Sequence, residues 1–159
     1  MANVLDKGQP KNKAQLKSLI EYAFNHNIYD LNFIDTSKIT DMSWLFGNVK
    51  HNFDVSKWDV SNVTNMSAMF YYCKNLNCDL SNWDVSNVTN TSGMFYFCKN
   101  FNCDLSNWDV SNVTYMYFMF GHCERLECDL SSWNVTKAKS TLNMFDGCDK
   151  VSIPNWYKK

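Results

Sequence analysis

The sequence repeats itself every 25 residues, and this period limits the fold more than any other feature. The stretch CDLSNWDVSNVT begins at Cys78 and begins again, identical, at Cys103, and a looser copy, CDLSSWNVTKAK, begins at Cys128. The chain holds about four and a half copies in all. Repeats of about 20–29 residues are typical of solenoids of the leucine-rich type, in which each copy covers the apolar side of its neighbour.

Each copy has the pattern of one strand and one short helix. In Trp83-Asp84-Val85, large apolar residues alternate with a carboxylate, as in a half-buried strand. The segment that follows the strand carries apolar residues at i, i+3, i+4 and i+7, which is one face of a helix: Met66, Met69, Phe70 and Cys73. We therefore predict an α/β repeat solenoid, leucine-rich-repeat-like, with about four to five strand-plus-short-helix repeats.

The two ends of the chain are expected to cover the ends of this stack. Residues 13–29 are predicted as an N-terminal capping helix that follows a tail over residues 1–12, with Asn12 as its N-cap. The repeat solenoid is predicted over residues 30–150, and residues 151–159 as a C-terminal cap and tail. One apolar face of the capping helix is formed by Leu16, Leu19, Ile20, Ala23 and Phe24.

Charge and hydropathy exclude several classes of partner. Lys and Arg number 15 against 16 Asp and Glu, so no basic excess favours nucleic acid or an anionic membrane surface. No apolar run is long enough to span a bilayer, and the amino end has no apolar stretch of the secretory type. We predict a chain that binds no nucleic acid and does not insert into membranes. Its seven cysteines and the missing signal favour the cytoplasm.

The cysteines fall in two columns at the repeat spacing, and we interpret them as small apolar thiols in equivalent core slots. A zinc site would instead have pairs of cysteines with two residues between them, so no metal is predicted. Disulfides between stacked neighbours remain an alternative. The columns are Cys73, Cys98, Cys123 and Cys148, and Cys78, Cys103 and Cys128.

The tryptophans and aspartates also form columns. We interpret the tryptophans, Trp58, Trp83, Trp108 and Trp133, as core residues that hold successive copies together, with a carbohydrate-stacking platform as the alternative. Each aspartate of these columns is followed two residues on by Ser or Thr. That spacing is typical of turns in which a side chain bonds to the backbone, and a Ca²⁺ site is the alternative.

Candidate binding residues lie where the copies differ from one another. Several of these variable positions hold large aromatic side chains, which are favoured at interaction surfaces. We predict a binding strip formed by Tyr71, Tyr72, Tyr96, Phe97, Tyr115, Tyr117 and Phe118. No catalytic residue and no cofactor are predicted, because the sequence has no Gly-rich phosphate loop and no nucleophile or metalloprotease motif.

The repeat resembles that of a known family. The stretch WDVSNVTNMSAMFYYCKNL, preceded by DLNFIDTSKITDMSWLF, is similar to the BspA-like leucine-rich repeat surface proteins, and more narrowly to their branch with a 25-residue WDVSNVTxMxxMF repeat. The resemblance covers residues 13 to 150. It implies a curved leucine-rich-repeat-like solenoid, a bacterial cell-surface or secreted location, and binding or adhesion rather than catalysis.

We therefore expect a non-catalytic module that binds a macromolecule, with a protein as the partner. The two alternatives are a structural or self-assembling unit, in which copies of the chain form a homo-oligomer, and a carbohydrate-binding surface protein.

The state of the cysteines gives a first testable prediction. Because all seven are expected to be core thiols, protein that is unfolded without reductant should react with thiol reagent at seven sites. Fewer than seven free thiols would favour the disulfide alternative.

Overall fold

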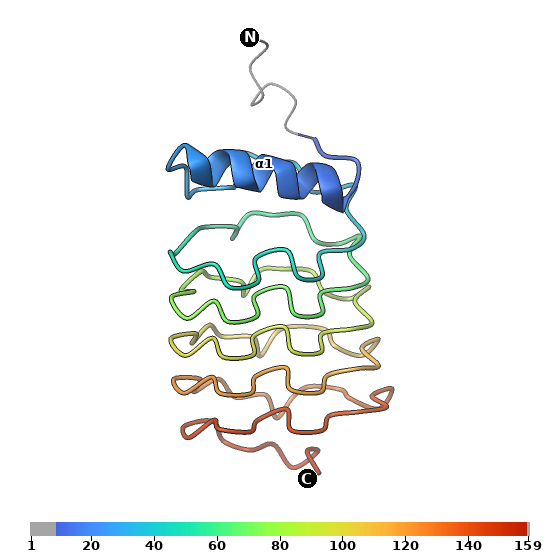
Figure 1. Cartoon of the computed structure of the whole chain (residues 1–159). Helices are drawn as coiled ribbons and strands as arrows, with labels where there is room; N and C mark the ends of the chain where they lie inside the picture. The colour runs from blue at the N-terminus through green and yellow to red at the C-terminus, as the bar shows by residue number, and fades with distance from the viewer. Residues whose placement is uncertain (1–8, 159) are drawn as a thin grey trace.

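The computed structural model describes residues 9–158 as one helix and a stack of coiled layers (Figure 1). Helix α1, Lys13–Asn25, lies across one end of the stack, and the carboxyl terminus lies at the other end. Residues 1–8 of the predicted tail and residue 159 lie outside the described residues. We call the five segments joined in series by four of the parallel bridges layers 1 to 5: residues 41–48, 65–72, 90–97, 115–122 and 140–147.

The prediction of an α/β leucine-rich-repeat-like solenoid, with a strand and a short helix in each copy, is wrong. Within residues 9–158, α1 is the one α-helix, and the only strand-like pairs are isolated bridges, such as those between Asp30 and Asp54 and between Asp41 and Asn65. The apolar residues assigned to the short helix are buried as expected. The spacing of these apolar residues was misleading. A run of tight turns, each closed by a hydrogen bond between residues three apart, places inward side chains at nearly the same intervals as a helix.

Alternate backbone N–H groups bond in two different directions, which explains why the layers are neither helix nor strand. The N–H of Tyr71 donates to the carbonyl of Ala68 in the same layer at 3.1 Å. The N–H of Phe70 donates instead to the carbonyl of Met94 in the next layer at 2.9 Å. The same alternation recurs along the stack, and four N–H···O=C bonds join each pair of successive layers. A helix would use its N–H groups within the segment, and a strand would not close these turns.

The fourth and eighth residues of every layer have a left-handed backbone. Their φ angles lie between 52° and 66° in all five layers. This conformation ends any helical run, and it costs a non-glycine residue about 1–2 kcal/mol. The ten positions are Trp44, Ala68, Gly93, Phe118 and Asn143, and Asn48, Tyr72, Phe97, His122 and Gly147.

Like residues lie above like residues in the core. The rings of Trp83 and Trp108 are 6.5 Å apart and 4° from parallel. Phe95 stacks on Phe70 at 5.5 Å and on Phe120 at 5.6 Å, and all three are fully buried. The four tryptophans of the column are only 3–4% exposed, so they form core and offer no platform to a carbohydrate.

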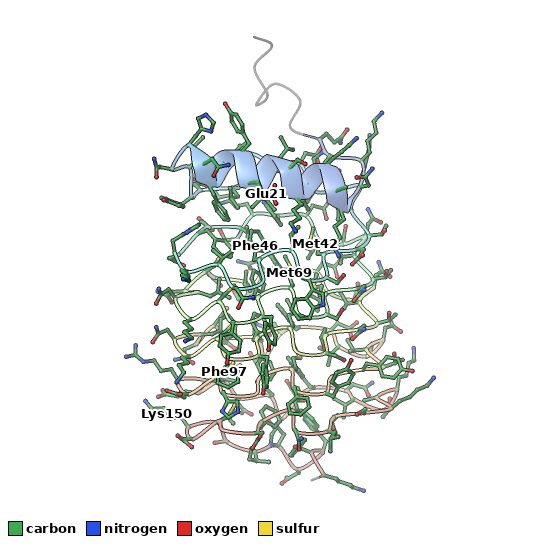
Figure 2. All side chains as sticks on the ribbon, in the orientation of Figure 1. Glu21, Met42, Phe46, Met69, Phe97 and Lys150 are labelled. Atoms are coloured by element: carbon green, nitrogen blue, oxygen red, sulfur yellow. The ribbon has the colours of Figure 1, made fainter. Side chains whose placement is uncertain are left out.

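Helix α1 covers the amino-terminal end of the stack. Its N-cap is Asn12, as predicted, whose side chain accepts a hydrogen bond from the N–H of Gln15 at 3.0 Å. Leu16, Ile20 and Ala23 of the helix are buried against the first layer. Figure 2 shows Met42 and Phe46 in the layer next to α1, with Phe97 farther along the stack.

The segment that follows layer 5 covers only part of the other end. Trp156 continues the tryptophan column, with its ring 6.4 Å from that of Trp133 and its Nε1–H donating to the carbonyl of Leu130. Tyr157 packs edge-on against Phe145. Ile153 remains 47% exposed.

The aspartate columns form turns, as their spacing predicts. The Oδ1 atoms of Asp79, Asp84 and Asp104 accept from the N–H two residues on at 2.9–3.1 Å. A third column, at the first residue of layers 1 to 3, makes the same bond from Asp41, Asn65 and Asn90, and the sequence analysis missed it. Asx turns therefore satisfy backbone N–H groups that the layer itself does not use.

A matched pair of variants tests this role. Asp84→Asn keeps the acceptor, as Asn134 does in the equivalent turn, whereas Asp84→Ala leaves the N–H of Ser86 without it. We expect urea unfolding at pH 7 to give little change for the Asn variant and a loss of about 1 kcal/mol for the Ala variant. Equal stabilities of the two variants would contradict the assignment.

The same pair predicts a pH effect. Hydrogen bonding from Ser86 lowers the pKa of Asp84 in the folded protein. The stabilisation from this carboxylate is therefore present above its unfolded pKa of about 3.9 and is lost as the pH falls through its lower folded pKa. Acid titrations of stability should show a steeper loss in the wild type than in Asp84→Asn.

Candidate functional site

The structure brings six of the seven predicted strip residues together, ring to ring. Tyr71 stacks on Tyr96 at 5.5 Å, and Tyr72 stacks on Phe97 at 4.5 Å. The ring of Phe118 meets Tyr96 edge-on at 5.5 Å, and Tyr117 in turn meets Phe118 edge-on at 6.5 Å. The seventh residue, Tyr115, lies elsewhere, with the Nζ of Lys139 at 5.9 Å from its ring centroid.

A groove of about 260 Å³ runs beside these rings. Ala68 and Ser92 lie deepest, since they are only 6% and 3% exposed. Trp44 and Tyr117 form the outer rim, with exposed fractions of 56% and 44%. None of the nine residues that line the groove carries a formal charge. The lining suits an uncharged, mainly apolar group.

The groove results from a difference between copies at one position, the fourth residue of the layer. Layers 1 and 4 have Trp44 and Phe118 there, whereas layers 2 and 3 have Ala68 and Gly93. The backbone is left-handed at all four positions, so only the side chains differ. Because layers in a parallel stack lie about 4.8 Å apart, the two small residues leave an opening about 10 Å long between two large rings.

A buried hydroxyl without a partner lies in this groove. The Oγ of Ser92 is buried and has no hydrogen-bond partner within residues 9–158, although its side chain lines the opening. The equivalent hydroxyl in layer 1, that of Ser43, accepts from the Nζ of Lys13 at 2.6 Å. A buried polar atom without a partner costs about 1–3 kcal/mol, so the groove holds an unused hydrogen-bonding group at its base.

The aromatic residues beside the groove are held at a conformational cost. Tyr72, Phe97 and Phe118 have φ of 60°, 60° and 54°, where a bulky side chain is an outlier. Glycine and asparagine occupy the same positions in other layers without this penalty. Since every layer has a left-handed backbone at these positions, the cost comes from the scaffold, and stacking between the rings offsets part of it.

Two further residues, Trp44 and His122, belong to this surface although the sequence did not predict them. Trp44 packs against Tyr71 at 5.0 Å and forms one end of the groove, and His122 stacks on Phe97 at 4.2 Å. A comparison of the fourth residue in all copies would have identified Trp44 as a second large aromatic residue in that set, beside Phe118.

The first cysteine column is structural. The Sγ of Cys73 donates to the carbonyl of Phe46 at 3.0 Å, and Cys98, Cys123 and Cys148 make the equivalent bond. Burial raises the pKa of Cys73 to about 12 and that of Cys98 well above its usual value. These thiols therefore stay protonated at neutral pH, which suits packing and disfavours nucleophilic chemistry.

The second cysteine column accepts hydrogen bonds from the backbone. The Sγ of Cys103 accepts from the N–H of Leu80 at 3.1 Å, and that of Cys128 accepts from the N–H of Leu105 at 3.1 Å. Burial raises the pKa of both thiols to about 11. All seven cysteines have free thiols, and no group of three or more His, Cys, Asp or Glu side chains within residues 9–158 is placed to hold a metal ion.

The unpaired hydroxyl of Ser92 leads to a stability prediction. Ser92→Ala removes a buried polar atom that has no partner, so the free energy of unfolding should rise by about 1 kcal/mol. The control is Ser67→Ala, which removes the equivalent hydroxyl in layer 2, where the side chain is partly exposed; it should change stability by less than about 0.5 kcal/mol. A Ser92→Ala protein that is less stable than the wild type in urea would show that this hydroxyl is already satisfied.

Among the comparisons with known proteins, the match to a protein family agrees with the repeated sequence. None of the helical structure in residues 9–158 has the length and apolar character needed to cross a bilayer. No curated protein and no solved structure matches the chain. A family described as "Mycoplasma protein of unknown function, DUF285" matches residues 14–102 and 40–156, and at family level this match agrees with the resemblance to BspA-like proteins. With nearly the whole chain covered, the protein belongs to the DUF285 family.

Proposed function

We propose that this protein is a non-catalytic binding module, and that its groove takes up an apolar side chain from a partner protein. The groove between Trp44 and Phe118, with its exposed rings and unpaired Ser92 hydroxyl, carries this proposal. At about 260 Å³ it is smaller than a typical pocket for a cofactor or drug-sized ligand, which occupies about 300–1,000 Å³. One large side chain on a protein surface is a closer match in size.

The composition of the groove supports a protein partner. Trp and Tyr at the rim are the residue types that contribute most to binding at protein interfaces. The stacked rings of Tyr71 and Tyr96 hold one another in place, so little side-chain entropy remains to be lost on binding. The Ser92 hydroxyl supplies a single polar contact that would fix the orientation of the incoming group.

The thiols support the absence of catalysis. Cysteine is the strongest nucleophile in the chain, and burial holds the pKa of all seven thiols above their usual value. Cys123, which follows His122 directly, donates to the carbonyl of Phe95 at 3.0 Å, whereas the His122 ring stacks on Phe97.

The repeat supports a finer placement within the family. The spacing of 25 residues and the recurring WDVSNVT sequence place the chain, in our proposal, in the BspA-like branch with that repeat. Adhesion to a protein ligand is the form of binding that this resemblance favours.

Groove-filling variants test the proposed function. Ala68→Phe and Gly93→Phe place in layers 2 and 3 the residue that layer 4 already carries as Phe118, at nearly the same φ. Peptides selected by display on the wild type should lose at least about tenfold in affinity for the double variant, which is about 1.4 kcal/mol. Far-UV circular dichroism and the melting temperature serve as controls for folding. Phe33→Ser, an exposed aromatic outside the groove, is the matched control and should bind like the wild type.

Three outcomes would contradict the proposal. Peptides that bind the filled and wild-type proteins equally would remove the groove from function. A glycan array that gives groove-dependent hits in place of peptides would make the ligand a carbohydrate. Light scattering that shows an oligomer, disrupted when the groove is filled, would make the occupant a second copy of this chain.

A further inference from the structure

The stack has a direction, because every layer donates hydrogen bonds to the layer that follows it. Between layers 4 and 5 the donors are the N–H groups of Met116, Phe118, Phe120 and His122, and the acceptors are the carbonyls of Ser140, Leu142, Met144 and Asp146. The bonds are 2.6–3.0 Å long. Within residues 9–158, one end of the stack therefore has unused carbonyls and the other end unused N–H groups.

Layer 5 repeats the geometry of the earlier layers, and within residues 9–158 no further layer lies beyond it. Its turns close in the same way, for example from the N–H of Asp146 to the carbonyl of Asn143. Asn143 and Gly147 have the left-handed backbone found at these positions throughout the stack. Within residues 9–158, no acceptor is present for the N–H groups at the four donor positions: Thr141, Asn143, Phe145 and Gly147.

The C-terminal segment leaves this row of donors open. Trp156 and Tyr157 cover the tryptophan column and the ring of Phe145. Beside them remains a cavity of about 390 Å³, lined by five residues of layer 5 and by four residues that follow it: Leu142, Asn143, Phe145, Asp146, Gly147, Cys148, Asp149, Ile153 and Tyr157. Leu142 is 60% exposed there, the largest exposure of any large apolar side chain in the described chain. The edge thus combines unpaired donors with uncovered apolar surface, as the edge of an unfinished sheet does.

A second copy of this chain does not fit the edge. The carbonyl end of the stack, which would complement the donors, lies under α1. Two copies that met through their C-terminal ends would place donors against donors. An occupant must therefore be a different segment that presents carbonyl oxygens at alternate residues, as each internal layer does.

The charges at the edge further define the occupant. Asp146 and Asp149 line the cavity, and no Lys, Arg or His is among its lining residues. The nearby Lys150 is engaged by Glu127, with Nζ 2.8 Å from Oε1. We propose that the open edge of layer 5 binds a backbone segment of a partner protein, which adds as a further layer and carries basic side chains opposite Asp146 and Asp149.

A peptide with the sequence of layer 3, residues 90–97, is a suitable probe because its backbone already forms such a layer in the protein. It is made with two lysines at each end, and the control peptide has two glutamates at each end. Amide NMR of the full chain should give saturable shifts at Asn143, Phe145 and Gly147 with the lysine peptide. The glutamate peptide should bind at least about fivefold more weakly, as expected for about 1 kcal/mol of charge interaction.

Two variants separate the edge from the groove. Asp146→Lys combined with Asp149→Lys changes exposed residues, and it should reverse the preference between the two peptides. The groove-filled Ala68→Phe, Gly93→Phe protein should bind the lysine peptide as the wild type does. In the free protein, the amides of Asn143, Phe145 and Gly147 should exchange with solvent much faster than those of Phe118, Phe120 and His122.

The proposal is overturned by slow exchange at the layer 5 amides in the free protein, by the absence of shifts there up to about millimolar peptide, or by shifts confined to the groove. Self-association that shifts these amides without peptide would assign the edge to a second copy and overturn the proposal as well.

Discussion

The hydrogen bonds between layers are the constraint on which the rest of the structure depends. Each layer uses alternate N–H groups for its own turns and the others for the next layer, so every layer must have the same turns at the same places. Layers 2 and 3 begin at Asn65 and Asn90, a separation of 25 residues (90 − 65). Layers 1 and 2 begin at Asp41 and Asn65, a separation of 24 (65 − 41), so the shorter copy must lose its residue in the connection after layer 1. The alignment of successive layers therefore tolerates a change of length in a connection but not within a layer.

The same constraint explains why the side chains repeat almost without variation. The Nε1–H of Trp83 donates to the carbonyl of Val55 and that of Trp108 to the carbonyl of Leu80, so each tryptophan satisfies a backbone group of the preceding copy. The thiols of Cys98 and Cys123 do the same for carbonyls of Phe70 and Phe95. A substitution at one level therefore leaves a buried polar group unpaired at another, in addition to the lost packing.

Function in such a molecule is expected where the repeat departs from itself. The groove exists because the fourth residue of two adjacent layers is small while its neighbours in the column are large. The open edge exists because, within residues 9–158, the segment after layer 5 covers the tryptophan column but offers no acceptor to the N–H groups of layer 5. The two sites have different causes, one in side-chain variation and one in backbone polarity.

The sequence by itself determined the period, the stacking of like residues, the buried Trp and Phe columns, the Asx turns and the N-cap at Asn12. These features follow from local spacing and from the requirement that each copy cover the apolar side of its neighbour. The sequence also indicated an aromatic surface. It did not include Trp44 in that surface, and it grouped Tyr115 with six aromatic residues from which Tyr115 is separate in the structure. Only the tertiary structure decided that the copies are runs of turns instead of strands and helices, because the direction of each N–H group depends on the neighbouring layer and not on apolar spacing. The groove and the open edge have the same origin: they are relations between layers, which no single copy of the repeat contains.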